Sequence, residues 1–405
     1  MNGFNAGFSE KFREVMMLEK VKVVNVWQIA GWNRNVGDWA LTYHQHRLLN
    51  KHARPYGLFF KFYPLDGQLT YFYPSLVDQM NEEADLVMVG GGGLIFHRPE
   101  DKSVSGWGFN ISIPDLHRIE KPVVVYVLGN NKFAYSNNAF PEMTSIHMRE
   151  LQKKSIYFSV RTTGVRNDMV SDFDLVPSKI EVIPDTGIYL HDRPISIPFK
   201  KRSGPLIAVN LAGDRPHYRY PEPAEENQQI CFDILRSALL RAVKELDATI
   251  MFLPHLHALD FAPFDKFSEG FPLGSIFSTH LEMPYLYAPP GVLLHPHIPF
   301  FTNLYRQADL VMGMRLHSCI FAYGAATRFI PLGAQDKIKH FVEDSGVPDY
   351  TVFKEGVKDT SESIYGKIVE CLKDEKFDEM LKKSLSAQTK LLRVFNEKII
   401  SLFNA

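Results

Sequence analysis

One stretch of the chain reads Ala308-Asp309-Leu310-Val311-Met312-Gly313-Met314-Arg315-Leu316-His317-Ser318-Cys319 and predicts a strand that passes directly into a helix. Its first five residues form a short, mostly apolar run of strand length, and Ser318 is suited to cap an apolar helix that extends to Ala326. Arg315 and His317 would then lie at the carboxyl end of a strand beside a helix N-terminus, where open α/β sheets bind ligands and anions are favoured. Because guanidinium groups bind phosphates and carboxylates and imidazoles transfer protons near neutral pH, the stretch predicts an anionic substrate and proton-transfer chemistry.

The same five letters occur earlier in the chain. Ala84-Asp85-Leu86-Val87-Met88 repeats residues 308–312 and runs into the glycines Gly90, Gly91, Gly92 and Gly93. This repeat predicts two similar α/β units that face each other. Four consecutive glycines after a buried strand are costly in conformational entropy, so we expect a ligand or a facing domain to approach bare backbone there.

The composition is that of a soluble globular protein, with 45% hydrophobic and 22% charged residues. A chain of 405 residues has room for two domains, each with its own core. The formal net charge of −1, without any long basic run, argues against nucleic acid as a partner. Three widely spaced cysteines, Cys231, Cys319 and Cys371, form neither a disulfide framework nor a metal clip and indicate a reducing compartment.

No segment of the sequence has the character of a membrane span or a secretory signal. Charged side chains interrupt the N-terminal segment, and no run of ~18 apolar residues occurs. We therefore expect a cytoplasmic protein, with the inner face of the membrane as a further location. From Leu381 to Leu402, apolar residues recur at helical spacing with lysines between them. This predicts a terminal helix docked on the domains or, alternatively, a membrane-surface helix and peripheral association.

The first half of the chain alternates strand and helix patterns. Residues 21–27 form a β-branched run that predicts the first strand, followed by a polar turn at 31–38 and a helix over 39–51. Helical segments between most strands imply a largely parallel sheet with helices on its faces. Further strands are predicted at 86–89, 123–128, 156–160 and 181–183.

The pattern restarts after a linker at 191–205 that is rich in proline, glycine and basic residues. Strands are predicted at 206–210, 249–253, 308–313 and 329–332, and helices at 227–246 and 318–326. Residues 260–300, rich in Pro, Phe, Tyr and His, are predicted to form irregular surface loops. We therefore predict a domain boundary within 190–205. The predicted units are an N-terminal Rossmann-like domain over 1–195, a C-terminal one over 200–375 and a docking helix over 376–405.

Two more strand ends carry charged residues. Ser159-Val160-Arg161 places a cation at the carboxyl edge of an apolar strand, and Pro184-Asp185 follows the next strand. From position alone, Arg161 is compatible with a surface charge and Asp185 with fixing a turn. The turn at 31–38 is not a GxGxxG loop, so a tight strand-to-helix turn with Asp38 near the helix N-terminus is an equally good interpretation.

Two histidine pairs are candidate metal ligands: His255 with His257, and His295 with His297. No cysteine or carboxylate recurs beside them at metal-site spacing, so we predict no metal.

In this order, the segments resemble the polysaccharide pyruvyl transferase family. The G-x-x-N-x-G-D-type turn of that family is matched by Gly31 and Asn35-Val36-Gly37-Asp38, and its glycine run by Val89–Leu94. Its S-V-R and V-x-P-D elements are matched by Ser159-Val160-Arg161 and Val182-Ile183-Pro184-Asp185. Its most specific signature, R-L-H-x-x-I-F-A followed by P-F-I, is matched by Arg315–Ala322 and Arg328-Phe329-Ile330.

The resemblance implies two Rossmann-like α/β domains that face each other across a cleft, as in B-type glycosyltransferases. It also implies transfer of a pyruvyl group from phosphoenolpyruvate to two hydroxyls of one sugar, with a cyclic ketal and phosphate as products and no metal or redox cofactor. The sugar would belong to a surface polysaccharide, such as a capsule or exopolysaccharide, or to its precursor. Arg161 and Arg315 are expected to bind the two anionic groups of the donor, and His317 to protonate its methylene carbon. The further residues expected to bind substrate are Asn35, Gly37, Asp38, Gly90, Gly91, Gly92, Gly93, Asp185 and Ser318.

The chain departs from the family pattern in two motifs. One extra residue separates Gly31 from Asn35, and Arg328 stands where proline is common. The segments 96–110 and 260–300 are idiosyncratic, and they are the regions that would select an acceptor. The sugar, its carrier (none, a nucleotide, a lipid or a polymer) and the oligomeric state stay open. Two other functions also stay open: a nucleotide-sugar-dependent glycosyltransferase of the same architecture, and a non-catalytic saccharide-binding or assembly subunit.

Overall fold

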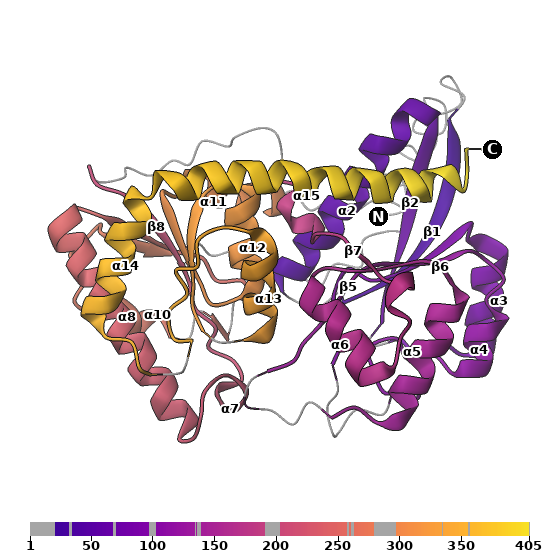
Figure 1. Ribbon diagram of the computed structural model, residues 1–405, viewed down its shortest axis with the longest axis horizontal. Coiled ribbons are helices and arrows are strands. Elements are labelled where there is room, and N and C mark those ends of the chain that lie inside the picture. The colour runs from indigo at the N-terminus through magenta and orange to yellow at the C-terminus, as the bar shows by residue number, and fades with distance from the viewer. Residues whose placement is uncertain are drawn as a thin grey trace, which may run out of the picture.

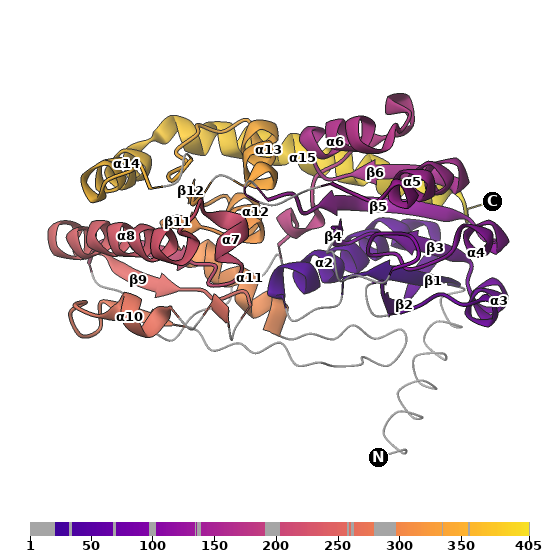
Figure 2. The same cartoon turned by 90° about the horizontal axis from the view of Figure 1, so that it is seen from below.

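The computed structural model contains two parallel sheets, each covered by helices, that lie side by side (Figures 1 and 2). The fold is therefore α/β with two Rossmann-like halves, as predicted. The residues that the structure describes are 21–31, 35–67, 70–96, 103–133, 135, 139–190, 203–256, 259–260, 263–278, 297–333, 335–354 and 357–404.

The first half is built on a seven-stranded sheet in the order β2-β1-β3-β5-β6-β7, with β4 also paired to β5. All eight residues of β5 are buried, because helices cover both faces of this parallel sheet. The strands are β1 (Lys22–Ala30), β2 (Leu58–Asp66), β3 (Leu86–Val89), β4 (Gly92–Ile95), β5 (Val123–Asn130), β6 (Ser155–Val160) and β7 (Glu181–Val182). The helices are α2 (Val36–Ala53), α3 (Pro74–Glu83), α4 (Ile113–Arg118), α5 (Glu142–Lys154) and α6 (Thr163–Phe173), with 3-10 turns η1 (Arg54–Tyr56), η2 (Pro177–Lys179) and η3 (Thr186–Ile188).

The second half is built on a five-stranded parallel sheet in the order β10-β9-β8-β11-β12. Its strands are β8 (Leu206–Asn210), β9 (Thr249–Phe252), β10 (Ile276–Ser278), β11 (Leu310–Gly313) and β12 (Arg328–Pro331). Its helices are α7 (Pro216–Arg219), α8 (Ala224–Leu246), α10 (Phe264–Ser268), α11 (His297–Gln307), α12 (Leu316–Gly324), α13 (Asp336–Ser345), α14 (Ser361–Lys373) and α15 (Glu375–Ser401). The predicted boundary falls mostly on residues 191–202, which lie outside the described residues.

Residues 260–300 are not uniformly loop, contrary to the prediction. Helix α10 and strand β10 form within them, and Phe267 is buried against Phe252. Phe267 is a core residue of the second half, which is why composition alone was misleading. Residues 279–296 lie outside the described part of the chain.

Helix α12 begins at Leu316, two residues earlier than predicted, so Ser318 is not its N-cap. The N-cap position is taken by Arg315, which makes no side-chain capping bond. The earlier start places His317 inside the first turn of the helix. At the corresponding edge of the first sheet, Asn35 does cap α2, because its side chain accepts a hydrogen bond from the Gly37 amide at 2.8 Å.

Helix α15 crosses both halves along one side of the molecule (Figure 1). Near its start, Ser384 accepts a 2.7 Å hydrogen bond from Tyr323 of α12, and near its end Asn396 accepts a 2.6 Å bond from the buried Tyr126 of β5. Its apolar face, including Leu381 and Ile399, is buried in the protein, as expected of a docked helix. Among the described residues, no helix has the length and apolar character needed to cross a bilayer.

Candidate active site

A cavity of about 200 Å³ lies between the carboxyl edges of the two sheets. The first half contributes residues that follow β1, β5 and β6, and the second half contributes residues that follow β8, β11 and β12. Convergence of strand ends at one place is the usual origin of ligand sites in open α/β folds. The lining residues used below are Asn35, Asp38, Gly93, Asn131, Phe133, Arg161, Asp214, Arg215, Arg219, Arg315, His317 and Lys337.

Five cationic side chains line this cavity: Arg161, Arg215, Arg219, Arg315 and Lys337. The lining carboxylates belong to Asp38 and Asp214. Most of these cations are buried or half-buried, where water screens their charge only weakly. The cavity is therefore suited to a small ligand with more than one negative group.

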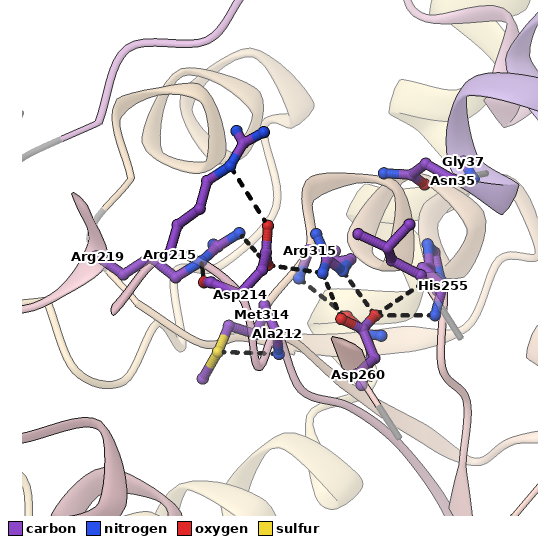
Figure 3. Close-up of polar contacts among 12 residues, drawn as sticks. Asn35, Gly37, Ala212, Asp214, Arg215, Arg219, His255, Asp260, Met314 and Arg315 are labelled. Atoms are coloured by element: carbon purple, nitrogen blue, oxygen red, sulfur yellow. Dashed lines mark hydrogen bonds and ion pairs between the residues drawn. The ribbon is translucent and has the colours of Figure 1, made fainter. Parts of the chain in front are cut away.

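Arg315 is held by two buried carboxylates of the second half (Figure 3). Its Nε donates to Asp260 Oδ2 at 2.6 Å, and its Nη2 donates both to Asp260 Oδ1 and, at 2.7 Å, to Asp214 Oδ1. Burial alone would lower the pKa of Arg315, but Asp260 and Asp214 outweigh it and raise that pKa above its usual value. Its Nη1 makes no hydrogen bond within the described part of the protein and is the atom left to contact a ligand.

Asp214 joins three arginines at the floor of the cavity. Arg219 donates from Nη2 to Asp214 Oδ1 at 3.1 Å, and Arg215 Nε lies 3.7 Å from Asp214 Oδ2. Burial raises the pKa of Asp214, but Arg315, Arg219 and Arg215 together lower it to about 2. The carboxylate is therefore ionised at neutral pH and fixes the arginines in place.

Asp185 lies between Arg161 of the first half and His317 of the second. Its Oδ2 is 3.9 Å from Arg161 Nη1 and 3.7 Å from His317 Nε2. Its Oδ1 accepts a 2.8 Å bond from the Gly187 amide, which fixes the carboxylate within η3. Asp185 is buried behind the cavity rather than in its wall, and its Oδ2 faces two residues that do line it without a hydrogen bond to either of them.

The guanidinium of Arg161 is anchored by a 3.1 Å bond from Nη2 to the carbonyl of Asn130, the last residue of β5. Burial lowers the pKa of Arg161, and the carboxylates of Asp185 and Asp38 act against that effect. Its buried Nε has no hydrogen-bond partner among the described residues. An unsatisfied donor of this kind costs ~1–3 kcal/mol.

Of the residues predicted to form the site, six line the cavity: Asn35, Asp38, Gly93, Arg161, Arg315 and His317. The others lie behind it. Ser318 is buried and accepts a 3.3 Å hydrogen bond from Tyr305, so it belongs to the packing of α12 on α11. A Cβ atom on Gly37 would overlap the imidazole of His317, so this glycine allows α2 to approach α12.

Three glycines of the run, Gly90, Gly91 and Gly92, have positive φ values of 132°, 107° and 106°. Their nearest neighbours are protein atoms, namely the Tyr126 carbonyl for Gly90, Thr42 for Gly91 and Asp38 for Gly92. Backbone conformation and close packing account for these three glycines. Gly93 is the member of the run that lines the cavity, and a Cβ there would overlap the side-chain amide of Asn131.

Sequence reasoning missed several residues of the site, chiefly Asp214, Arg219, Asp260 and Lys337. Asp214 and Arg219 follow β8, and Lys337 follows β12, so the rule that found Arg161 and Arg315 also applied to them. Asp260 has no such signal, because it follows β9 at a distance and within a segment predicted as loop.

The predicted absence of a metal site rested on histidine spacing. His255 Nε2 lies 2.5 Å from the hydroxyl of Tyr305, in the core behind the cavity. His257 and His295 lie outside the described residues, as does the side chain of His297. Within the described part, no group of three or more histidine, cysteine or carboxylate side chains is placed to hold a metal ion.

Sequence comparison agrees with the motifs that line the cavity. Residues 21–336, well over half of the chain, match the sequence model of the family described as polysaccharide pyruvyl transferase. The chain belongs to this family. The matched region contains Arg161, Asp185, Arg315 and His317, and it ends one residue before Lys337. No protein of curated function matches the chain significantly in sequence.

Solved structures share the fold at low sequence identity. A glycosyltransferase from Rickettsia africae ESF-5 superposes with a TM-score of 0.57 at 11% identity, covering 95% of this chain and 100% of the other. A putative UDP-N-acetylglucosamine 2-epimerase from Listeria monocytogenes gives 0.54 at 13% identity, covering 89% and 91%. A UDP-GlcNAc 2-epimerase from Neisseria meningitidis, solved with UDP-GlcNAc, gives 0.52 at 11% identity, covering 94% and 100%. Likeness at this level establishes the two-domain architecture and nothing about substrate.

Proposed function

We propose that this member of the family transfers a pyruvyl group from phosphoenolpyruvate to two hydroxyls of one sugar, forming a cyclic ketal and releasing phosphate. The observation that carries the proposal is the placement of Arg161, Arg315 and His317 around one small cationic cavity, with contributions from both halves. Phosphoenolpyruvate is small and carries two anionic groups, a phosphate and a carboxylate. It therefore matches both the size and the charge of the cavity.

The two arginines offer separate contacts to the donor. Arg315 is fixed by Asp260 and Asp214 and presents Nη1, and Arg161 is fixed by the Asn130 carbonyl and lines the cavity. Because both guanidinium groups are anchored before any ligand arrives, little side-chain entropy is lost on binding. We assign one anionic group of the donor to each.

The proton transfers of the proposed reaction assign a role to His317. In the proposed reaction, the imidazolium gives a proton to the methylene carbon of the donor, and positive charge develops at its central carbon. The first sugar hydroxyl adds to that carbon and loses its proton. The second hydroxyl then displaces phosphate and closes the ring, so that one hydroxyl proton replaces the proton given by His317 and the other balances the proton that phosphate carries away. A histidine is suited to this transfer near neutral pH.

The acceptor would enter from the side of the first half. Asp38 and Gly93 line the cavity there, and a carboxylate is a natural hydrogen-bond acceptor for sugar hydroxyls. We propose that the acceptor is a saccharide of a surface polysaccharide or of its nucleotide- or lipid-linked precursor. Since phosphoenolpyruvate is a cytoplasmic metabolite, the reaction would take place in the cytoplasm or at the inner face of the membrane.

The test is phosphate release from phosphoenolpyruvate with a panel of galactosyl, glucosyl and N-acetylhexosaminyl acceptors, with mass spectrometry of the product. The proposal requires phosphate release that depends on an acceptor, and a product that carries a pyruvyl ketal. Turnover of a sugar nucleotide without use of phosphoenolpyruvate would instead establish a glycosyltransferase. Saccharide binding that survives loss of Arg161 and His317, with no turnover of either donor, would establish a non-catalytic subunit.

A further inference from the structure

Lys337 lines the cavity and has no carboxylate partner among the residues that the structure describes. It lies in the first turn of α13, and its Nζ donates a 3.2 Å hydrogen bond to Asn131 Oδ1. Its ammonium also lies 5.2 Å from the centre of the Phe133 ring. Within the described part of the protein, no carboxylate lies within ion-pair distance of this side chain.

Three carboxylates in or behind the cavity wall, Asp214, Asp260 and Asp185, already face arginines. Asp214 and Asp260 bind Arg315, and Asp214 also binds Arg219. Asp185, in turn, faces Arg161. Lys337 is therefore the cavity cation whose positive charge is least balanced by the protein.

The single hydrogen-bond acceptor of Lys337 is fixed in its orientation. Asn131 donates from Nδ2 to the Gly93 carbonyl at 2.8 Å, and its backbone amide donates to the Ile95 carbonyl at 2.9 Å. Because the amide nitrogen is used in this way, the Oδ1 atom is turned toward Lys337. Glycine at position 93 leaves room for this arrangement, since a Cβ there would overlap the Asn131 amide. A neutral acceptor of this kind binds a lysine without requiring that it be charged.

Burial and the nearby arginines together disfavour a protonated Lys337. Burial has the largest effect and holds the pKa of Lys337 well below its ordinary value. The nearby charges of Arg219, Arg161 and Arg315 lower it further. The carboxylate of Asp38, on α2, opposes them to a smaller extent. A trianionic ligand in the same cavity would reverse this balance.

We propose that Lys337 takes up a proton when phosphoenolpyruvate binds and gives that proton to the departing phosphate. This inference rests on the proposed function. As the bond between the central carbon and the phosphate oxygen breaks, the electron pair stays on that oxygen, which takes the proton from the ammonium. The amine is then neutral again, and the proton of the second hydroxyl leaves to solvent. The proton that Lys337 takes up at binding thus leaves with phosphate, and the second hydroxyl returns one proton to solvent. Lys337 is then neutral, as it was before the donor bound.

Calorimetric titration of the full-length protein with phosphoenolpyruvate, in buffers of different ionisation enthalpy, measures this uptake. At about pH 8 the donor phosphate is fully ionised, because its second pKa is about 6. We expect wild-type protein to take up close to one proton per bound donor. Binding without uptake overturns the inference and leaves the proposed function intact, whereas absence of donor binding refutes the proposed function itself.

Variants assign the proton to one side chain. Lys337→Met should bind the donor more weakly and without uptake, and Lys337→Arg should bind it without uptake because a guanidinium is always protonated. Lys337→Arg should also lower turnover by about 10²-fold, as expected for a lost acid. Lys339→Met, at an exposed lysine two residues along α13, is the matched control and should behave as wild type. Uptake that persists in Lys337→Met but disappears in His317→Gln, or full turnover in Lys337→Arg, would overturn the assignment.

Discussion

Nε2 of His317 lies 3.7 Å from Oδ2 of Asp185, although one residue belongs to the second half of the molecule and the other to the first. The same carboxylate oxygen lies 3.9 Å from Arg161. One buried carboxylate thus faces both the proposed acid and a proposed donor-binding arginine. This arrangement requires a fixed distance between the two halves of the molecule. Helix α15 spans both halves and is hydrogen-bonded to each of them.

Replacement of His317 by glutamine should separate binding from turnover. We expect the affinity for phosphoenolpyruvate to be largely kept and turnover to fall by ~10²-fold or more, because a general acid is lost while the two arginines remain. Donor binding by calorimetry and acceptor-dependent phosphate release check this. His117→Gln, at an exposed histidine of α4, is the control. Near-normal turnover of folded His317→Gln protein would mean that the proton comes from another group.

The two arginines should differ in what their loss does to stability. Arg161→Ala should weaken donor binding by at least about tenfold, which corresponds to ~1.4 kcal/mol. Arg315→Ala should weaken binding similarly but also lower the free energy of unfolding by ~3–5 kcal/mol, since it leaves Asp260 buried without its cation, whereas Asp214 keeps Arg219. Chemical denaturation of both variants makes the comparison.

A second change provides the control for Arg315. Asp260→Asn in the Arg315→Ala background removes the uncompensated charge, so it should recover part of the lost stability without recovering donor binding. If the double variant is no more stable than Arg315→Ala, the buried charge is not the source of the loss.

Gly91→Ala should act on stability rather than on chemistry. Gly91 has a φ of 107° and does not line the cavity, and a Cβ there would lie 3.2 Å from Thr42 Oγ1. We expect the free energy of unfolding to fall by ~1–3 kcal/mol while activity per folded molecule stays normal. Gly366→Ala in α14 is the matched control, because no atom lies within 4 Å of its added Cβ and alanine should stabilise that helix by about 1 kcal/mol. Loss of activity in fully folded Gly91→Ala protein would show that this glycine serves the ligand after all.

Stability should decrease below neutral pH because of buried histidines in the first half. Burial lowers the pKa of His147 to about 4 and that of His46 to about 3, from 6.5 in the unfolded chain. Below pH 6.5 the unfolded state binds protons that the folded state excludes, so each histidine should remove ~2 kcal/mol of stability between about pH 8 and pH 5. Stability is fully present above pH 6.5. Denaturation curves across this range measure the slope.

His147→Gln should make that slope shallower. His147 Nδ1 accepts a 2.9 Å hydrogen bond from the indole of Trp107, and the glutamine amide oxygen can accept the same bond without titrating. An unchanged slope in this variant would assign the pH dependence to other groups.

The local pattern of the sequence was sufficient to predict most strands and the class of fold. Apolar runs of strand length predicted β3, β8 and β11 with little error, because a strand of a parallel sheet is buried on both faces and must be apolar throughout. Strand β2 escaped detection: it lies at the edge of its sheet, alternates in burial and contains Pro64, which an edge strand tolerates. The rule that ligands bind at strand ends was also enough to place Arg315 and His317 at one site, and the resemblance to the family added Arg161.

The tertiary structure decided what those residues contact. Arg315 binds Asp260 and Asp214, which lie 55 and 101 residues away in the chain, and no local pattern records which carboxylates converge on one guanidinium. The same convergence leaves Lys337 without a carboxylate, a property that depends on every neighbour at once. Local sequence determines which residues prefer a strand or a helix, because propensity and burial act over a few residues. The charge state and reach of a side chain in the cavity depend on distances between strand ends, and only the folded chain sets those.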